Sequence, residues 1–275
     1  MKAAAFDYAR AGDLAEAVRL LGEGEGSAKL IAGGQSLGPM LNLRLVRVGL
    51  LVDIRRLEAL RTVEEGEGTL RYGALITHSE FEDGRVPDAG NGLLRQVGGG
   101  IAYRAVRNRG TLGGSLAHAD PAADWISAFT ALDATLQIEG PAGRRSLPLA
   151  GGLLGAFTLD LGETEILTAV EVPRLGAGAR WGWHKINRKT GEFADAIGVA
   201  LLDEERGFCR VVCGAVEGPP VVLAAVAEAL RAEGRQAGRA LVPAAVAEAL
   251  PALDPVGRHL HVVAVQRAID QVFGR

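Results

Sequence analysis

Two short glycine-rich turns constrain the fold of this 275-residue chain more than any other feature of its sequence. The first glycine turn, Gly33-Gly34-Gln35-Ser36, follows a short apolar run from Lys29 to Ala32. The second glycine turn, from Gly110 to Ser115, follows the basic segment Arg107-Asn108-Arg109. Consecutive glycines let backbone N–H groups converge on an anion without obstruction by side chains. Two such turns in one domain favour a shared ligand that carries phosphate.

The side chains at these turns strengthen that interpretation without settling it. Gln35, Ser36, Thr111 and Ser115 add amide and hydroxyl donors, whereas an ordinary tight turn needs one glycine and no donor set. From the residues alone, phosphate binding and plain turn chemistry remain equal alternatives. No G-x-G-x-x-G follows the first strand and no P-loop pattern occurs, so a nucleotide site would be of another kind.

The first 175 residues predict alternating helices and strands. Asp13 is predicted to cap a helix because Glu16, three residues later, completes a capping box. Strands are expected near 29–32 and 50–54, and a helix that begins near 91 is expected to end at the glycines 98–100. Asp120 is predicted to cap a further helix whose first residue is Pro121, with Trp125, Phe129 and Leu132 on one face.

The composition of the sequence changes after Pro173. A glycine-rich polar segment over 174–180 predicts a boundary near 176, and hence two domains over 1–176 and 177–275. Strand-like runs then cover 181–187, 196–202 and 209–216. Alanine-rich helices are predicted near 221–232, 243–249 and 258–273, broken by Gly234 and Pro251.

Charge and cysteine usage exclude several classes of function. The formal charge of −3 comes from interspersed charges that form no basic stripe, so nucleic acid is not expected as a partner. Cys209 and Cys213 have no further cysteine or nearby histidine to complete a metal or iron–sulfur site. No apolar stretch approaches eighteen residues and no signal peptide is evident, which predicts a cytoplasmic protein that is not integral to a membrane.

Two longer segments resemble a known family. AGGQSLGPMLNLRL (32–45) and VRNRGTLGGSLAHADPAADW (106–125) look like the two FAD motifs of the FAD-binding medium subunit of the xanthine dehydrogenase and carbon monoxide dehydrogenase family, the molybdenum hydroxylases. FDYARAGDLAEAVRLL, GETEILTAVEVP and KINRKTGEFADAIGVA also resemble family segments in the same order. The resemblance implies an α+β protein. Its N-terminal FAD-binding domain would have two α/β subdomains (PCMH-like), and its C-terminal domain would have a three-stranded antiparallel sheet and helices.

The resemblance also implies which residues hold the cofactor. The diphosphate would lie along Lys29, Ala32, Gly33, Gly34, Gln35 and Ser36, and would meet Thr111, Leu112, Gly113, Gly114 and Ser115 from the other side. Asp124 would bind the sugar-alcohol chain, Lys185 would lie at the pyrimidine edge of the flavin ring, and Phe193, Ile166 and Leu167 would contact the ring. No catalytic side chain and no metal ligand is expected, because FAD is the redox centre.

Each of these single residues has a structural alternative. Asp124 suits the first turn of any helix because of the helix dipole. Lys185 suits the solvated face of a strand, and Phe193 suits a core. His118, alone between the second glycine turn and Asp120, is expected to be structural rather than catalytic.

The implied function is that of one subunit in a larger enzyme. A molybdenum cofactor in a large partner would oxidise the substrate, two [2Fe-2S] clusters in a small partner would relay electrons, and FAD on this chain would pass them to an external acceptor. The assembly would be a dimer of heterotrimers. Two alternatives remain open: a self-sufficient flavin-dependent oxidoreductase of the same wider fold, and a structural subunit without flavin.

Overall fold

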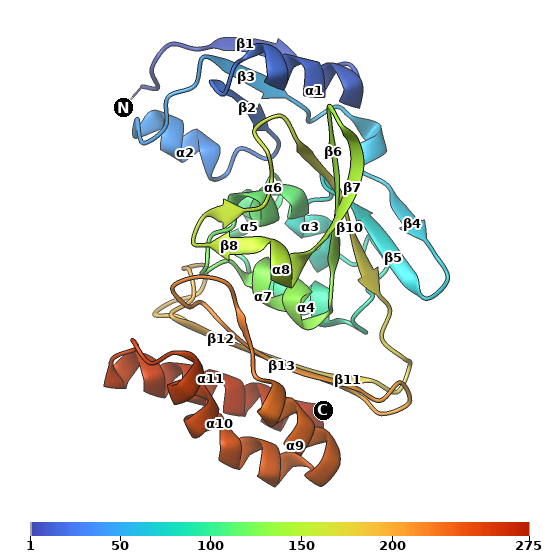
Figure 1. Cartoon of the computed structure of the whole chain (residues 1–275), viewed down its shortest axis with the longest axis vertical. Helices are drawn as coiled ribbons and strands as arrows, with labels where there is room; N and C mark the ends of the chain where they lie inside the picture. The colour runs from blue at the N-terminus through green and yellow to red at the C-terminus, as the bar shows by residue number, and fades with distance from the viewer. Residues whose placement is uncertain (1, 275) are drawn as a thin grey trace.

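The N-terminal end of the molecule is a small parallel sheet in the strand order β1-β3-β2 (Figure 1). The computed structural model describes residues 2–274. This first sheet contains β1 (Asp7–Arg10), β2 (Ala28–Ile31) and β3 (Leu50–Asp53), and its connections form α1 (Leu14–Glu23) and α2 (Leu37–Asn42). The predicted cap of α1 is confirmed, because the Asp13 carboxylate accepts a hydrogen bond from Glu16 N at 2.8 Å.

A five-stranded antiparallel sheet in the order β4-β5-β10-β6-β7 forms the middle of the molecule. After the 3₁₀ helix η1 (Glu58–Leu60), its strands are β4 (Val63–Glu65), β5 (Thr69–Gly73), β6 (Thr135–Gly140), β7 (Gly143–Pro148) and β10 (Ile166–Pro173). Five helices separate β5 from β6: α3 (His78–Glu82), α4 (Leu93–Gly100), α5 (Arg104–Arg107), α6 (Leu112–His118) and α7 (Asp124–Ala131). Between β7 and β10 lie α8 (Leu149–Gly152), β8 (Leu153–Gly155) and β9 (Thr158–Leu159).

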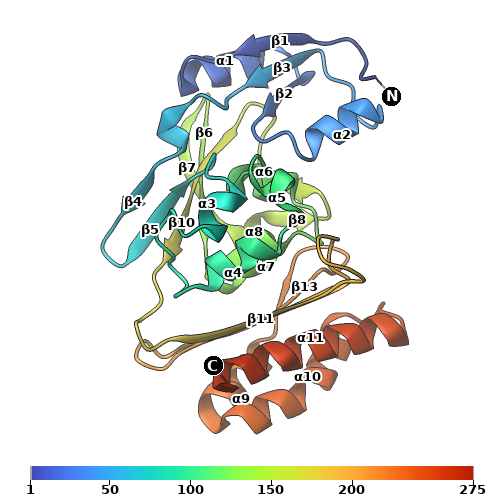
Figure 2. The same cartoon turned by 180° about the vertical axis from the view of Figure 1, so that it is seen from behind.

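The C-terminal part is an antiparallel sheet covered by three helices. The three predicted strands are confirmed as β11 (Arg180–Ile186), β12 (Ala196–Asp203) and β13 (Phe208–Gly214), and the two-residue β14 (Val221–Val222) extends the expected three-stranded sheet by one strand. The helices are α9 (Ala224–Glu233), α10 (Arg235–Ala249) and α11 (Pro255–Gly274). Helices α9 and α11 pack on one face of the sheet and α10 packs against both of them, while α4 and α7 contact the other face of the sheet (Figure 2).

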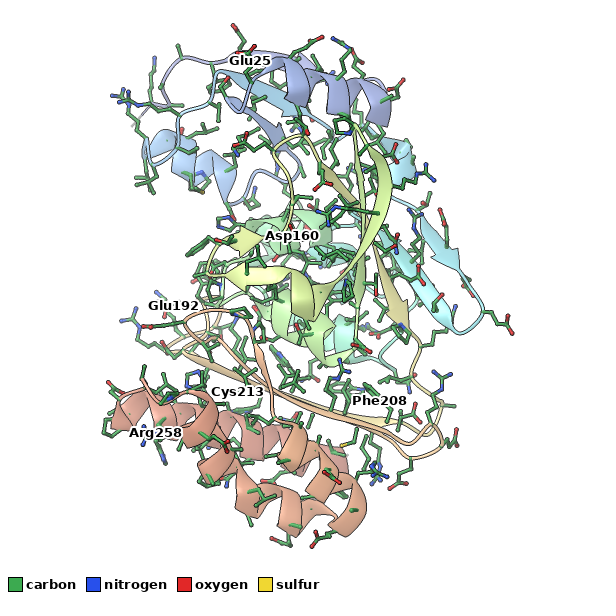
Figure 3. The ribbon with its side chains drawn as sticks, in the orientation of Figure 1. Glu25, Asp160, Glu192, Phe208, Cys213 and Arg258 are labelled. Atoms are coloured by element: carbon green, nitrogen blue, oxygen red, sulfur yellow. The ribbon has the colours of Figure 1, made fainter. Side chains whose placement is uncertain are left out.

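The core is continuous across the sequence boundary near 176. Trp125 and Phe129 of α7 belong to the same buried cluster as Trp183, Ile197 and Val199 of the C-terminal sheet. A second cluster lies between that sheet and the three helices and includes Cys213, which Figure 3 labels on β13. Both cysteines are free, and burial raises the pKa of the Cys213 thiol to about 12. Within residues 2–274 no helix is long and apolar enough to cross a membrane.

The predicted start of α7 is wrong by three residues. The helix begins at Asp124 rather than at Pro121, and its N-cap is Ala123. The Asp120 carboxylate instead accepts a hydrogen bond from Ala122 N at 3.0 Å, which closes a separate turn ahead of the helix. Every residue of α7 is buried, because the helix lies between the middle of the molecule and the C-terminal sheet. The prediction that only one face of this helix is buried was therefore also wrong.

The predicted helix over 243–249 is also too short. Helix α10 begins at Arg235 and continues through Pro243. Proline has no N–H, so the carbonyl of Arg239, four residues earlier, loses its helical partner. The Gln266 side chain of α11 donates to that carbonyl at 3.2 Å, which supplies the missing hydrogen bond. Helix α11 thus stabilises Pro243 inside α10, although the local sequence predicts that a helix begins at this proline.

Candidate cofactor site

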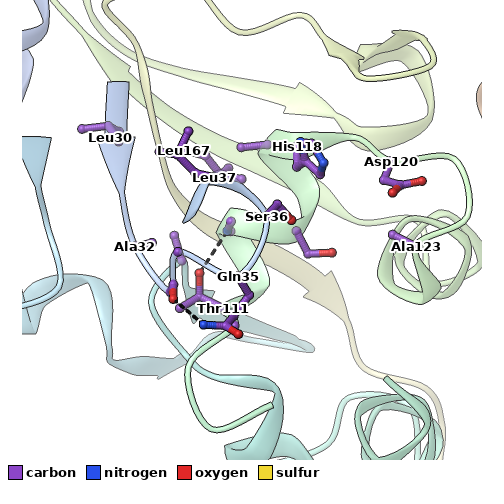
Figure 4. A pocket seen from close by; sticks show the side chains of 18 of the residues that line it. Leu30, Ala32, Gln35, Ser36, Leu37, Thr111, His118, Asp120, Ala123 and Leu167 are labelled. Atoms are coloured by element: carbon purple, nitrogen blue, oxygen red, sulfur yellow. Dashed lines mark hydrogen bonds between the residues drawn. The ribbon is translucent and has the colours of Figure 1, made fainter. Parts of the chain in front are cut away.

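A cavity of about 600 Å³ lies where the small parallel sheet, α6, the β9 to β10 segment and β11 meet. Fourteen of the sixteen residues predicted to bind cofactor line it: Lys29, Ala32, Gly33, Gly34, Gln35, Ser36, Thr111, Gly113, Gly114, Ser115, Asp124, Leu167, Lys185 and Phe193. In Figure 4, Leu30 lies on one side of the two glycine turns and Asp120 and Ala123 lie on the other. The pocket therefore has two ends with the turns between them.

The first glycine turn presents unused donors to this cavity. The backbone N–H groups of Gly33, Gly34, Gln35 and Ser36 donate no hydrogen bond to any group of residues 2–274. The Gln35 side chain donates to Gly33 O at 3.1 Å, so it braces the turn from within. Converging free N–H groups form the kind of concavity that binds anions in proteins. The turn is thus built to receive a negatively charged group.

The second glycine turn offers the cavity fewer unpaired backbone donors than the first. Most of its N–H groups are occupied: Leu112 N donates to Ile76 O and Gly113 N to Ala74 O, both at 2.9 Å. Gly114 N and Ser115 N donate to the Thr111 hydroxyl and carbonyl, because Thr111 caps α6. What this turn offers the cavity is the hydroxyl of Ser115, which has no partner within residues 2–274.

The glycines leave the backbone accessible to a ligand, and they also allow the two turns to pack closely against each other. A Cβ atom on Gly33 would lie 2.0 Å from Arg109 O, and a Cβ atom on Gly113 would lie 2.5 Å from the Cβ atom of Ala74. Gly34 has a φ of +69°, which L side chains rarely adopt. The first turn therefore rests directly on the backbone that leads into the second. That contact holds the donor-bearing turn in place.

Two predicted residues do not reach the cavity. Leu112 is fully buried in the largest core cluster, and Ile166 belongs to the cluster beneath the small parallel sheet. Ile166 and Leu167 are neighbours on β10, and successive side chains of a strand point to opposite faces. Only Leu167 can therefore line the cavity. Leu112 and Ile166 support the cavity wall from behind.

Asp124 and Lys185 form a buried ion pair at one end of the cavity. Lys185 Nζ lies 2.9 Å from the Oδ2 atom of Asp124, and the two side chains are 6% and 5% exposed. Lys185 also donates to Gly100 O at 3.4 Å. The other carboxylate oxygen, Asp124 Oδ1, is buried and has no partner within residues 2–274. Lys185 is therefore not the solvated lysine of the structural alternative, and Asp124 retains a free acceptor.

The free energy of unfolding should depend on pH through Asp124. Burial raises the pKa of its carboxyl from 3.8 to about 6, even though Lys185 opposes the shift. The folded chain then binds more protons than the unfolded chain, so the stabilising contribution is complete below about pH 4 and is lost as the pH rises through about 6. Relative to Asp124→Asn, the wild type should lose about 3 kcal/mol of stability between pH 4 and 7. Urea titrations of both chains at several pH values measure this, and a difference independent of pH would contradict it.

Sequence reasoning missed His78, which also lines the cavity. Trp125 Nε1 donates to His78 Nδ1 at 2.9 Å, and burial lowers the pKa of this histidine to about 3. The ring is therefore neutral and fixed. Its only signal in the sequence was its place after Thr77 at a helix start, which does not indicate a cavity. His118 lines the cavity too, with its ring 5.3 Å from that of Phe157.

The two ends of the cavity differ in chemistry. Leu30, Leu37, Met40, Val46 and Leu161 give one end an apolar surface. The other end has the Asp124–Lys185 pair, with the 66% exposed ring of Phe193 beside it. Unused backbone donors at the middle, apolar side chains at one end and a buried charge pair at the other suit an extended dinucleotide, and the volume falls in the usual range for cofactor pockets. Fold and site thus define a dinucleotide-binding protein outside the Rossmann and P-loop classes.

Comparison with known proteins gives the family. Residues 4–175 match the model of the FAD binding domain in molybdopterin dehydrogenase. The chain belongs to this family. The carbon monoxide dehydrogenase medium chain of Hydrogenophaga pseudoflava is 34% identical over 98% of both chains. The 6-hydroxypseudooxynicotine dehydrogenase complex subunit alpha of Paenarthrobacter nicotinovorans is 38% identical over 76% of this chain and 71% of its own length.

Solved structures agree over the whole length. A chain of carbon monoxide dehydrogenase from Hydrogenophaga pseudoflava superposes with a TM-score of 0.92 and 32% identity, and the match covers 100% of this chain and 99% of that one. A chain of quinoline 2-oxidoreductase from Pseudomonas putida 86 gives a TM-score of 0.85 at the same identity and coverage. The fold expected from the resemblance is therefore confirmed, including the C-terminal part that the family model does not cover.

Proposed function

We propose that this chain is the FAD-binding subunit of a heteromeric molybdenum hydroxylase and that FAD lies extended along the cavity. The observation that carries the proposal is the set of unpaired N–H groups at Gly33 to Ser36, which would bind the diphosphate. The adenosine would occupy the apolar end. The flavin would occupy the end with Asp124 and Lys185, because a fixed cation favours the negative charge of a reduced flavin.

The roles of the other residues follow from their positions. When bound, FAD would supply reversible redox chemistry at its ring. Asp124 Oδ1 would accept a hydrogen bond from a hydroxyl of the sugar-alcohol chain, and Ser115 would donate to the diphosphate. Lys29 would add a positive charge near the adenosine end, and Leu167 and Phe193 would contact the ring. Residues 1–176 and 177–275 would be the two domains, a division supported by a family match that ends at residue 175.

The names of the relatives support the proposed partners. Medium chains of carbon monoxide dehydrogenases, in Hydrogenophaga pseudoflava and in Afipia carboxidovorans, are each 31% identical or more to this chain. By analogy, a large subunit with a molybdenum cofactor and a small subunit with two [2Fe-2S] clusters would pass electrons to FAD here, and an external acceptor would take them up. The proposed assembly is a dimer of heterotrimers in the cytoplasm.

The cofactor in the purified protein tests this proposal. The chain should be expressed with and without its candidate partner subunits, and the absorbance spectrum should show flavin bands, with FAD rather than FMN released on denaturation. FAD together with reduction of the flavin by the substrate of the complex would support the electron-transfer role. Turnover of an organic substrate by the isolated chain would favour a self-sufficient enzyme instead. Absence of flavin even in the assembled complex would leave a structural subunit.

A further inference from the structure

The Asp124–Lys185 pair joins two distant parts of the chain in a dry environment. Asp124 is the first residue of α7, and Lys185 lies near the end of β11, 61 positions later. Both side chains are at least nine-tenths buried, and their charged atoms are 2.9 Å apart. Charges in such a setting are weakly screened, so each strongly affects the field of the other. A ligand at this end of the cavity meets the pair rather than a free ammonium.

The positions of the other charged groups make this pair the main fixed charge at its end of the cavity. Within residues 2–274, Lys29 and Lys185 are the two lysines that line the cavity, and Lys29 lies on β2 at the apolar end. Glu192 also lines the cavity but already pairs with Arg188 and Lys189. The Asp120 carboxylate accepts a hydrogen bond from Ala122 N and is only half-buried.

Asp124 has two effects on Lys185. Asp124 Oδ2 and Gly100 O hold two of the three N–H donors of Lys185, which fixes the ammonium against the cavity wall. The carboxylate at the same time offsets the positive field that the ammonium exerts on the cavity. Removal of the carboxylate charge, with its shape kept, would therefore strengthen the effective charge of Lys185.

We propose that Asp124 is a positioning residue that sets, through Lys185, how strongly the site prefers reduced over oxidised flavin. This inference rests on the proposed function, since it takes the flavin to lie at this end of the cavity. In this role Asp124 binds the sugar-alcohol chain and also limits the increase in flavin midpoint potential that Lys185 causes. A role confined to the sugar-alcohol chain would change FAD affinity without shifting the redox balance.

A double-mutant cycle tests the coupling. The variants Asp124→Asn, Lys185→Met and the double variant, expressed with the partner subunits, are compared in FAD content and in flavin midpoint potential. Asp124→Asn should raise the ratio of reduced to oxidised affinity about tenfold, the scale of close charge pairs, which is about 30 mV for a two-electron couple. Lys185→Met should lower the potential. In the Lys185→Met background Asp124→Asn should have little further effect, because an unpaired buried carboxyl takes up a proton.

Two controls separate this role from a general disturbance. Asp124→Glu retains the charge and should keep the wild-type potential, whereas Lys189→Met removes a lysine that is 68% exposed and should change nothing. An Asp124→Asn chain that retains FAD at an unchanged or lower potential would overturn the inference. So would an effect of Asp124→Asn that persists in full without Lys185.

The remaining outcomes also decide the question. If the wild type itself holds no FAD, the proposed function fails rather than the pairing. If Asp124→Asn or the wild type does not load FAD, the coupling is measured in the flavin-free chain by carbon NMR of labelled aspartate. There Lys185→Met should raise the pKa of Asp124 further above the wild-type value, and an unchanged pKa would refute the coupling.

Discussion

Gly33→Ala should weaken FAD binding about 100-fold and lower the free energy of unfolding by about 3 kcal/mol. The added Cβ atom would lie 2.0 Å from Arg109 O and 2.8 Å from the Cα atom of Gly110. These are backbone atoms, so relief requires the first glycine turn to move away from the second. The unpaired N–H groups would then shift with the turn, and the loss of two charge-assisted hydrogen bonds to the cofactor would account for the weaker binding. Titration with FAD and equilibrium denaturation measure the two effects.

Gly38→Ala is the matched control for this change. Gly38 lies five residues later in α2, and a Cβ atom there would meet nothing within 4 Å. Because alanine favours a helix over glycine, this variant should gain about 0.5–1 kcal/mol of stability and bind FAD as the wild type does. Wild-type FAD affinity in Gly33→Ala would show that the diphosphate does not lie at this turn.

Lys185→Met should cost about 3 kcal/mol of stability at pH 7, because the buried carboxyl of Asp124 loses its cation and must take up a proton. The loss should shrink below pH 6, where Asp124 takes up a proton and no longer needs a cation. Denaturation curves of the FAD-free chain at pH 5 and 7 measure both values. Here the FAD-free chain isolates the ion pair from any effect of the cofactor.

A lysine from the connection that follows β11 serves as the control. Lys189 is largely exposed and its nearest carboxylate oxygen, on Glu192, is 3.5 Å away. Exposed pairs of this kind contribute little, so Lys189→Met should change stability by less than about 0.5 kcal/mol. Equal losses in both variants at both pH values would mean that the Asp124–Lys185 pair contributes no more than a surface contact.

The sequence predicts those parts of the site that local chemistry determines. The glycines and donors of both turns are local signals, and so are the cap at Asp13 and the three strands after the boundary. The family resemblance added Asp124 and Lys185, and the structure brings them to the same cavity. Their direct contact was not predicted, because no rule of spacing relates two residues on separate elements 61 positions apart.

Two parts of the backbone depend on partners that are distant in the sequence. At Pro243 and in the second glycine turn, tertiary partners decide which backbone groups are satisfied. Gln266 supplies the carbonyl of the proline-containing helix with a donor, and Ala74 O and Ile76 O occupy N–H groups of the second turn. A local pattern shows which groups need partners but does not show where those partners lie.

The position of helix α7 links cofactor binding to the stability of the whole chain. It is buried between the middle of the molecule and the C-terminal sheet, and its first residue closes the cavity against Lys185 of that sheet. A ligand in the cavity therefore contacts both parts, and binding free energy is added to the stability of the folded state. A chain without FAD would therefore be less stable and would be degraded sooner. The supply of FAD would thus affect how much of the folded subunit persists.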